Sequence, residues 1–188
     1  MRLDVPAILL LVGLATATAG CGKPPIEPRV APGAQLASIT VTSPTVSAGG
    51  RIPVDHTCDG SDLRPDLVLS APPPGTKSLV LLLEDPDAPS GVFTHMIAFD
   101  VAAESRRIPG GADLAGAGKA ARFGLNDFGS PRYAGPCPPR GEAHRYRFRV
   151  LALDRVLGLG EGAPRDKVDA AMDGHILGEG VLSGHFGH

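Results

Sequence analysis

Residues 78–95 read SLVLLLEDPDAPSGVFTH, and this stretch does most to decide the fold. Its run of apolar residues, LVLLL, has no polar position. A strand with this pattern is covered on both faces, so we expect it at the centre of a β-domain. Asp85 and Asp87 follow beside prolines that fix the turn, and His95 lies on the next expected strand. Carboxylate and imidazole groups placed in this way suit a small preformed pocket for a charged ligand.

The composition favours a single β-rich domain. The chain has 188 residues with 25 glycines and 19 prolines, which suits short strands joined by shaped loops. A net charge of −2 gives no reason to expect nucleic acid as a partner. A helix is expected from Pro164 to Asp173, and His175 to Val181 is either a last strand or a helical extension. Strands are expected at Ser38 to Thr42, Arg51 to His56, Asp66 to Ser70, Ser78 to Glu84, Thr94 to Val101 and Tyr146 to Asp154.

A second polar stretch precedes the last of these strands. It consists of Asn126-Asp127-Phe128-Gly129, then Gly135-Pro136-Cys137-Pro138-Pro139-Arg140-Gly141, then His144-Arg145-Tyr146. Strand alternation puts His144 and Tyr146 together on the apolar face, and it puts His95 on the face of Ile97 and Phe99. We therefore expect the two histidines and Asp85 to converge.

Other polar groups near this stretch have simpler interpretations. The Asn126 to Gly129 turn is expected to position the proline loop rather than touch a ligand. The opposite strand face is expected to be solvated or paired with carboxylates; it carries Arg145, Arg147 and Arg149. Three histidines are expected at the surface or terminus: His175, His185 and His188.

The N-terminus is expected to direct export. Residues 1–20 have the early Arg2, an apolar run and small residues of a signal peptide, and the run is too short to span a bilayer. Thr18-Ala19-Gly20-Cys21 resembles a bacterial lipoprotein processing site, in which Cys21 would be lipidated and anchor the protein in the cell envelope. Ordinary cleavage after residues 17–19, releasing a soluble secreted or periplasmic protein, is the alternative. Residues 21–36 would be a proline-rich tether, and residues 37–188 the domain.

Two further cysteines, Cys58 and Cys137, lie far apart in the sequence. In an exported chain two thiols favour a disulfide, which would brace the proline loop against the body of the domain. Metal binding is the less favoured alternative, because neither cysteine belongs to a C-x-x-C motif or a paired histidine spacing.

Taken in order, these motifs resemble the phosphatidylethanolamine-binding protein (PEBP) family, in its bacterial Raf-kinase-inhibitor-like or YbhB/YbcL-like branch. The resemblance covers the chain from about Ile39 to the C-terminus. It implies a mostly β fold of two antiparallel sheets, a few short helices and a small anion-binding cavity at one end. The cavity residues that it implies are Asp85, His95, Gly135, Cys137, Pro138, His144 and Tyr146.

The chain also departs from the family pattern. The family often has tryptophan at the positions of Leu69 and Met96, and this chain contains none, so an aromatic rim is expected to be missing. Arg132 replaces a usual glycine and Asp100 a usual asparagine. These changes leave the polar centre of the cavity unaltered.

Three classes of function remain open from the sequence. The favoured one is noncatalytic binding of a small anionic, phosphate-bearing ligand, with histidines that donate hydrogen bonds when protonated and no cofactor. The second is inhibition of a protease or kinase partner, a role known in the family. The third is a hydrolase using Asp85 with His95 or His144, or a metal enzyme using all three, although no G-x-S-x-G motif is present.

Overall fold

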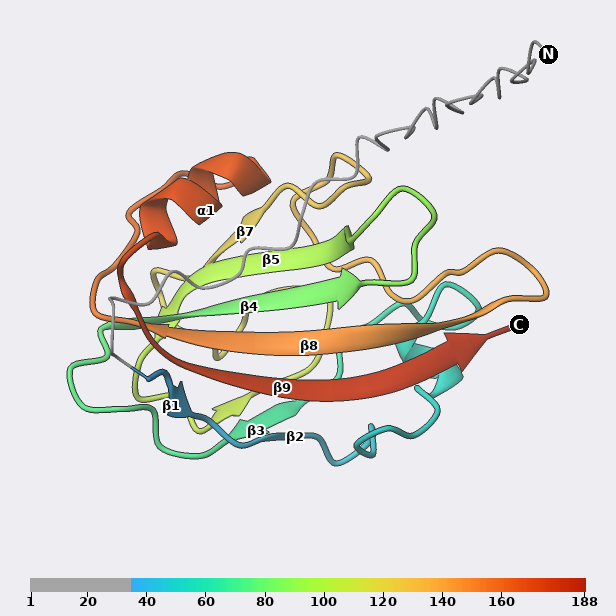
Figure 1. Ribbon diagram of the computed structural model, residues 1–188, viewed down its shortest axis with the longest axis horizontal. Coiled ribbons are helices and arrows are strands. Elements are labelled where there is room, and N and C mark those ends of the chain that lie inside the picture. The colour runs from blue at the N-terminus through green and yellow to red at the C-terminus, as the bar shows by residue number, and fades with distance from the viewer. Residues whose placement is uncertain (1–34) are drawn as a thin grey trace, which may run out of the picture.

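The computed structural model describes residues 35–188, which form two β-sheets and one short α-helix (Figure 1). The expected signal peptide, Cys21 and the tether up to residue 34 lie outside the described residues. Within residues 35–188, no helix is long and apolar enough to cross a membrane. The elements in chain order are β1 (Ala37–Ser38), β2 (Val41–Thr42), η1 (Val54–His56), β3 (Leu67–Leu69), β4 (Ser78–Asp85), β5 (Phe93–Ala102), β6 (Arg107–Ile108), β7 (Arg122–Gly124), β8 (Ala143–Leu153), α1 (Arg165–Met172) and β9 (Ile176–Gly187).

The larger sheet has six strands in the order β1-β9-β8-β4-β5-β7, and the smaller has three in the order β2-β3-β6. All pairs between these strands are antiparallel except β1 with β9, which is parallel. The expected two antiparallel sheets are therefore confirmed, with one parallel pair at an edge. Figure 1 shows β4 ending and β8 beginning at the same end of the large sheet, and the site described below lies at that end.

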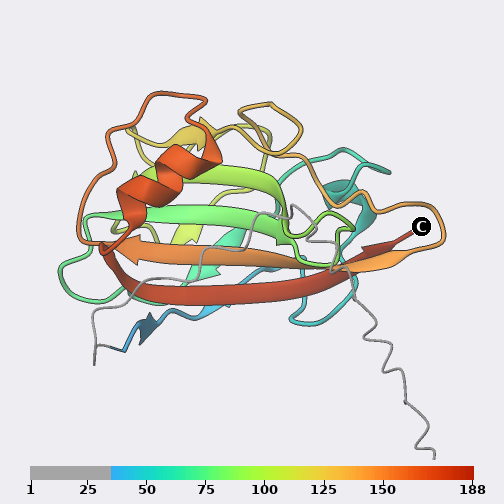
Figure 2. The same ribbon diagram turned by 45° about the horizontal axis from the view of Figure 1, so that its top comes forward.

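The strand β4 lies at the centre of the molecule, as its sequence predicts. Every residue from Ser78 to Asp85 is buried. Leu81 belongs to a core between the two sheets, and Leu82 belongs to a second core between the large sheet and α1. Figure 2 shows α1 lying over the strands of this sheet. An apolar residue at every position is needed because both faces of β4 are covered.

The helix and the last strand agree with their sequence patterns. Pro164 precedes α1, and Gly174 follows it with a φ of 77°, a conformation that glycine adopts without strain. Of the two alternatives for His175 to Val181, a last strand or a helical extension, the structure has the strand. This strand, β9, runs for 12 residues along the whole of β8.

Two strand expectations were wrong. Residues 51–56 form no strand: Arg51 makes one isolated bridge to β9, and η1 follows Pro53 directly. Proline has no N–H to donate to a ladder, which ends pairing at this point. The segment expected as one strand from Ser38 to Thr42 is two short strands, β1 and β2, which belong to different sheets.

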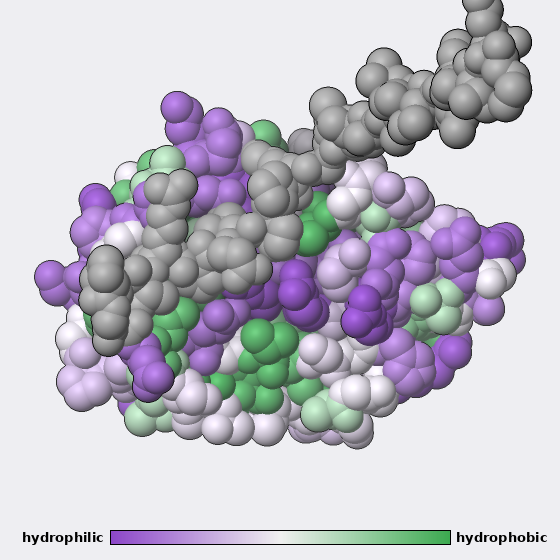
Figure 3. All heavy atoms as spheres, viewed as in Figure 1, coloured by the Kyte–Doolittle hydropathy of each residue, from purple (hydrophilic) through white to green (hydrophobic). Residues whose placement is uncertain are grey.

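The arginines of β8 are paired with carboxylates, as expected. Arg149 and Arg147 contact the buried Glu84 at 3.1 and 3.4 Å, and Arg165 of α1 contacts it at 3.0 Å. Arg145 forms an exposed pair with Asp87 at 2.6 Å. In the view of Figure 3, hydrophilic residues lie along β8, and a hydrophobic patch lies over the neighbouring β9. The row of arginines therefore connects strands and helix rather than forming a free basic surface.

Candidate functional site

A cavity of about 160 Å³ lies where β4 ends and β8 begins. This volume suits a small head group, because sites for larger organic ligands span roughly 300–1,000 Å³. Its walls come from four segments far apart in sequence: the end of β4 with its turn, the start of β5, the loop after β7, and the proline loop that enters β8. The lining residues are Asp85, Ala88, Pro89, Phe93, His95, Phe128, Cys137, Pro138, Pro139 and His144.

The imidazole ring of His144 lies between two carboxylates and contacts one with each nitrogen. Its Nδ1 contacts Asp85 Oδ2 at 2.7 Å, and its Nε2 contacts Glu142 Oε2 at 3.1 Å. Burial opposes the charged imidazole, but the hydrogen bonds to Asp85 and Glu142 outweigh it and raise the pKa of His144. The ring therefore stays protonated to a higher pH than a free histidine does.

His95 has the opposite electrostatic character. Its Nδ1 donates to the carbonyl of Ala134 at 3.0 Å, and burial lowers its pKa. In the neutral ring Nε2 is then an acceptor. The expectation that both histidines act as protonated donors is thus corrected: the structure favours the charged form of His144 and the neutral form of His95.

His95 reaches the cavity because of a β-bulge. Leu83 of β4 pairs with Met96, but the next residue, Glu84, pairs with Thr94, so His95 is an extra residue without a partner in β4. Such a residue interrupts alternation and redirects its side chain. The alternation argument, which placed His95 on the face of Ile97 and Phe99, was therefore wrong about the face. The bulge turns the ring to the inter-sheet side.

The backbone around this bulge is held from both sides. Thr94 N donates to Asp127 Oδ2 at 2.6 Å, and the Thr94 hydroxyl accepts from Arg165 of α1 at 2.7 Å. The His95 carbonyl accepts from the side chain of Asn126 at 3.3 Å and from the Ala134 backbone at 3.2 Å. The site is preorganised by these bonds.

Aromatic rings line one side of the cavity, contrary to expectation. Phe93 and Phe128 lie edge to face with each other at 4.8 Å, and each packs against His95, at 5.1 and 5.6 Å. The missing tryptophans therefore do not leave the cavity without an aromatic rim. Phe128 also corrects the architectural interpretation of its turn: Asn126 and Asp127 support the backbone, but Phe128 touches the cavity. The sequence signal that could have predicted this contact was an apolar ring in an otherwise polar turn.

Two of the expected cavity residues lie behind its wall. Tyr146 is fully buried beside His95, with ring centroids 5.4 Å apart, and its hydroxyl has no well-formed hydrogen bond among the described residues. Burial and the nearby Asp85 raise its pKa. Gly135 donates its N–H to Asp62 at 2.6 Å, and an added Cβ would lie 2.3 Å from the carbonyl of His56. Gly135 therefore allows close packing, and its N–H is already used.

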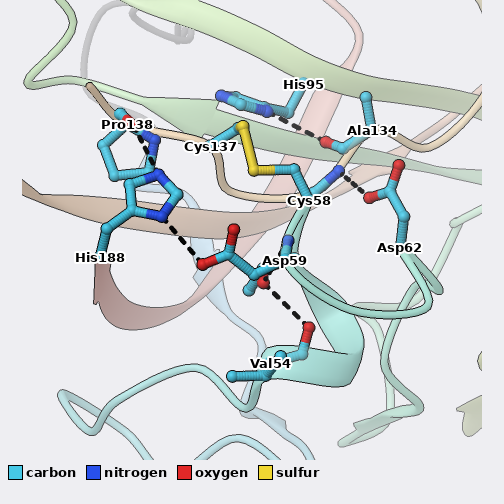
Figure 4. The surroundings of a disulfide bond; sticks show 11 residues. Val54, Cys58, Asp59, Asp62, His95, Ala134, Cys137, Pro138 and His188 are labelled. Atoms are coloured by element: carbon cyan, nitrogen blue, oxygen red, sulfur yellow. Dashed lines mark hydrogen bonds and ion pairs between the residues drawn. A yellow bond between two sulfur atoms is a disulfide. The ribbon is translucent and has the colours of Figure 1, made fainter. Parts of the chain in front are cut away.

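The disulfide Cys58–Cys137 holds the proline loop, which confirms the expected pairing (Figure 4). The backbone N of Cys58 donates to Pro136 at 3.2 Å beside it. Figure 4 also shows His188 contacting Asp59 and the carbonyl of Pro138, at 2.8 and 2.9 Å. His188 is thus more than a solvated terminal residue, because it joins the same two segments as the disulfide.

The turn on the other wall is held by Asp87. Its carboxylate accepts from the backbone N and the guanidinium of Arg145, and Arg145 lowers the pKa of Asp87 to about 2. The backbone N of Asp87 in turn donates to Asp85 Oδ1 at 2.9 Å. The cavity carboxylate Asp85 is therefore fixed at one oxygen by its own turn and at the other by His144.

The titratable side chains that line the cavity are Asp85, His95 and His144. Cys137 is in a disulfide, and none of the other lining residues is a serine, threonine or lysine nucleophile. Among residues 35–188, one trio of metal-binding side chains has its ligand atoms within 4.8 Å, and it consists of Cys58, Cys137 and His188. The disulfide occupies both sulfurs of this trio, and the expected alternative trio of Asp85, His95 and His144 does not form one.

Comparison with known proteins agrees with this architecture. The family model described as phosphatidylethanolamine-binding protein matches residues 42–187. A UPF0098 protein of Aquifex aeolicus is 42% identical over 154 residues, spanning 79% of this chain and 88% of the relative. A UPF0098 protein of Methanothermobacter thermautotrophicus is 46% identical over 136 residues, spanning 72% of this chain and 89% of the relative.

Solved structures show the same similarity. A crystal structure of a PEBP homologue from Chlamydia trachomatis gives a TM-score of 0.73 at 36% identity, covering 80% of this chain and 98% of the other. The crystal structure of E. coli YbcL, described as a member of the mammalian PEBP family, gives a TM-score of 0.74 at 26% identity, covering 81% of this chain and 99% of the other. The chain therefore belongs to the phosphatidylethanolamine-binding protein family.

Proposed function

We propose that this protein binds a small anionic, phosphate-bearing ligand in the cavity without transforming it. The observation that carries the proposal is the buried imidazole of His144, whose charged form is favoured by Asp85 and Glu142 at the wall of a cavity of head-group size. A charged N–H in a partly desolvated site is a strong donor to a phosphate oxygen.

Neutral His95 favours a particular protonation state of the ligand. A phosphate monoester has a second pKa of about 6, so near that pH much of it keeps one P–OH group. That group can donate to the acceptor nitrogen of His95 while another oxygen accepts from His144. The apolar rings of Phe93 and Phe128 would contact the adjoining organic part of the ligand. Binding should therefore weaken as pH rises, because the phosphate group of the ligand and the imidazole of His144 both lose protons.

Isothermal titration with inorganic phosphate and phosphoethanolamine at pH 6 and pH 8 tests this function. We expect saturable binding at pH 6 that weakens at pH 8 and is lost in His144→Ala and His95→Ala. His185→Ala is the matched control, because that ring is exposed and bonds only the Gly49 carbonyl among the described residues. No heat at either pH would reject the anion site. Ligand recovered as a hydrolysis product would reject noncatalytic binding.

Export and anchoring through Cys21 form part of the same proposal, supported by the sequence pattern of residues 1–21. A bacterial host should retain the protein in its membrane fraction, and Cys21→Ala should release it. Release of the unchanged protein would instead favour ordinary cleavage and a soluble product. Inhibition of a protease or kinase stays a prediction of the sequence alone.

A further inference from the structure

The outward nitrogen of His144 is already occupied by a carboxylate of the same chain. Asp85 holds Nδ1 from inside, and Glu142 holds Nε2 from the rim. The side chain of His144 is 6% exposed and that of Asp85 5%, whereas that of Glu142 is 55% exposed. Asp85 is therefore a fixed partner, while Glu142 has solvent into which it can move.

Glu142 is placed at the rim by a tight turn. Its backbone N donates to the carbonyl of Pro139 at 3.1 Å, and Gly141 within this turn has a φ of 85°, which suits glycine. Pro138 and Pro139 line the cavity immediately before it. The carboxylate of Glu142 thus approaches His144 from the end of a cavity-lining segment.

The charges around His144 leave Glu142 as the exchangeable group. Asp85 comes from β4 and Asp87 from the following turn, where the latter is neutralised by Arg145. The cavity's other imidazole, His95 of β5, has a pKa lowered by burial. Facing His144 across the β8–β9 ladder is Phe186, which carries no charge.

A protonated imidazole has one N–H at Nε2, which can be donated well to one acceptor at a time. We propose that Glu142 is an internal competitor for the anion site and sets its affinity: a ligand oxygen must displace this carboxylate from Nε2 of His144. The inference rests on the proposed anion-binding function and identifies the residue that limits it. Displacement costs the existing charge-assisted bond, and Glu142 also repels an incoming anion.

Inorganic phosphate is the probe for the test, with the full chain at pH 5.5, on the acid side of the raised pKa of His144. Glu142→Gln keeps the size of the side chain but removes its charge, and we expect it to bind phosphate about three- to tenfold more tightly. Glu142→Ala should give a similar gain. Glu104→Gln, which removes an exposed charge beyond the other end of β5, should stay within about twofold of the native affinity.

Salt distinguishes displacement from general repulsion. At about 0.5 M salt, where the screening length is roughly 4 Å, a contact competitor still matters and a distant charge does not. We expect the gain of Glu142→Gln over the native chain to persist. A second readout is the pKa of His144 by NMR without ligand, which should be lower in Glu142→Gln.

The outcomes separate this inference from the function on which it rests. Equal phosphate affinity for the native chain and Glu142→Gln overturns the inference that Glu142 competes with the ligand, and it leaves the binding function intact. A gain that vanishes at high salt also overturns it. If neither the native chain nor Glu142→Gln binds phosphate, both the proposed function and the competition by Glu142 are rejected. Binding by Glu142→Gln with none by the native chain supports both.

Discussion

Removing the disulfide beside the cavity should cost this domain a large part of its stability. Cys58 and Cys137 are 79 residues apart in the sequence. Closing a loop of that length in the unfolded chain removes conformational entropy equivalent to about 4.5 kcal/mol at 25 °C. Typical domains are stable by only about 5–15 kcal/mol, so the double variant Cys58→Ser/Cys137→Ser should unfold at a much lower urea concentration.

Noncovalent bonds will retain part of the local structure in that variant. His188 joins Asp59 to the Pro138 carbonyl, and Gly135 N–H still donates to Asp62. These contacts act only in the folded state, so they should keep the proline loop near its place without replacing the entropic effect. We therefore expect a loss of about 3–4 kcal/mol in the free energy of unfolding, together with a few-fold weaker binding of phosphate.

Equilibrium unfolding in urea, followed by circular dichroism, measures the first effect. The control is His188→Ala, which removes a partly exposed pair between the same segments and should cost less than about 1 kcal/mol. If the double variant lost less than about 1 kcal/mol with an unchanged urea dependence, the constraint on the unfolded chain would be negligible and the entropic reasoning refuted. A loss from His188→Ala as large as that from the double variant would assign the stability to folded-state contacts instead.

Three further predictions concern stability. Glu84→Gln should cost about 3–5 kcal/mol in urea unfolding, because three arginines lose their buried anion; Glu104→Gln should be nearly neutral, and equal effects would contradict a buried network. His144 has a pKa raised on folding, so its contribution to stability should be complete below about pH 6.5 and disappear as pH rises through the folded-state pKa; a His144→Gln variant whose stability follows the same pH profile as the native chain would exclude this linkage. Gly135→Ala should lower the melting temperature by several degrees, because the new Cβ would meet backbone at 2.3 Å, while Gly160→Ala has open space; comparable melting temperatures for the two variants would argue against tight packing at Gly135.

The parts of the fold with strong local patterns could be predicted from the sequence. The apolar run of β4, the proline and glycine that flank α1, and the alternation along β8 each reflect a local requirement for burial or for backbone geometry. The segment 51–56 could not be placed correctly by hydrophobicity alone. Pro53 has no backbone N–H to donate to a neighbouring strand, so strand pairing stops there and η1 begins. The short strands β6 and β7 have too few residues to show any period.

The candidate site was predicted in its membership better than in its geometry. Asp85, His95 and His144 do meet at one cavity, but the opposite pKa shifts of the two histidines depend on the burial of His95 and on the two carboxylates that bond His144, which only the folded structure shows. Nothing in the local sequence distinguishes Glu142 from any other exposed acidic residue in a loop. Its importance follows from a single contact, the one with Nε2 of His144.

At the end of β4, a carboxylate paired with arginines adjoins a carboxylate paired with a titratable histidine. Glu84 and Asp85 are neighbours, so strand alternation points them to opposite faces of the sheet. Glu84, facing α1, is completely buried and bound by three arginines, which makes it a fixed part of the scaffold. Asp85, facing the cavity, has the imidazole of His144 as its ionic partner.

The same scaffold also fixes the other imidazole. Arg165 bonds both Glu84 and the hydroxyl of Thr94, so the ion-pair network on the α1 face holds the strand position directly before His95. The bulge that redirects His95 therefore depends on charges that never face the cavity. Because the Glu84 carboxylate is completely buried on the α1 face, a change in the charge of His144 on the cavity side leaves this ion-pair network intact. One strand end therefore supplies a different carboxylate for each role, so the proposed proton-dependent binding is compatible with a rigid cavity.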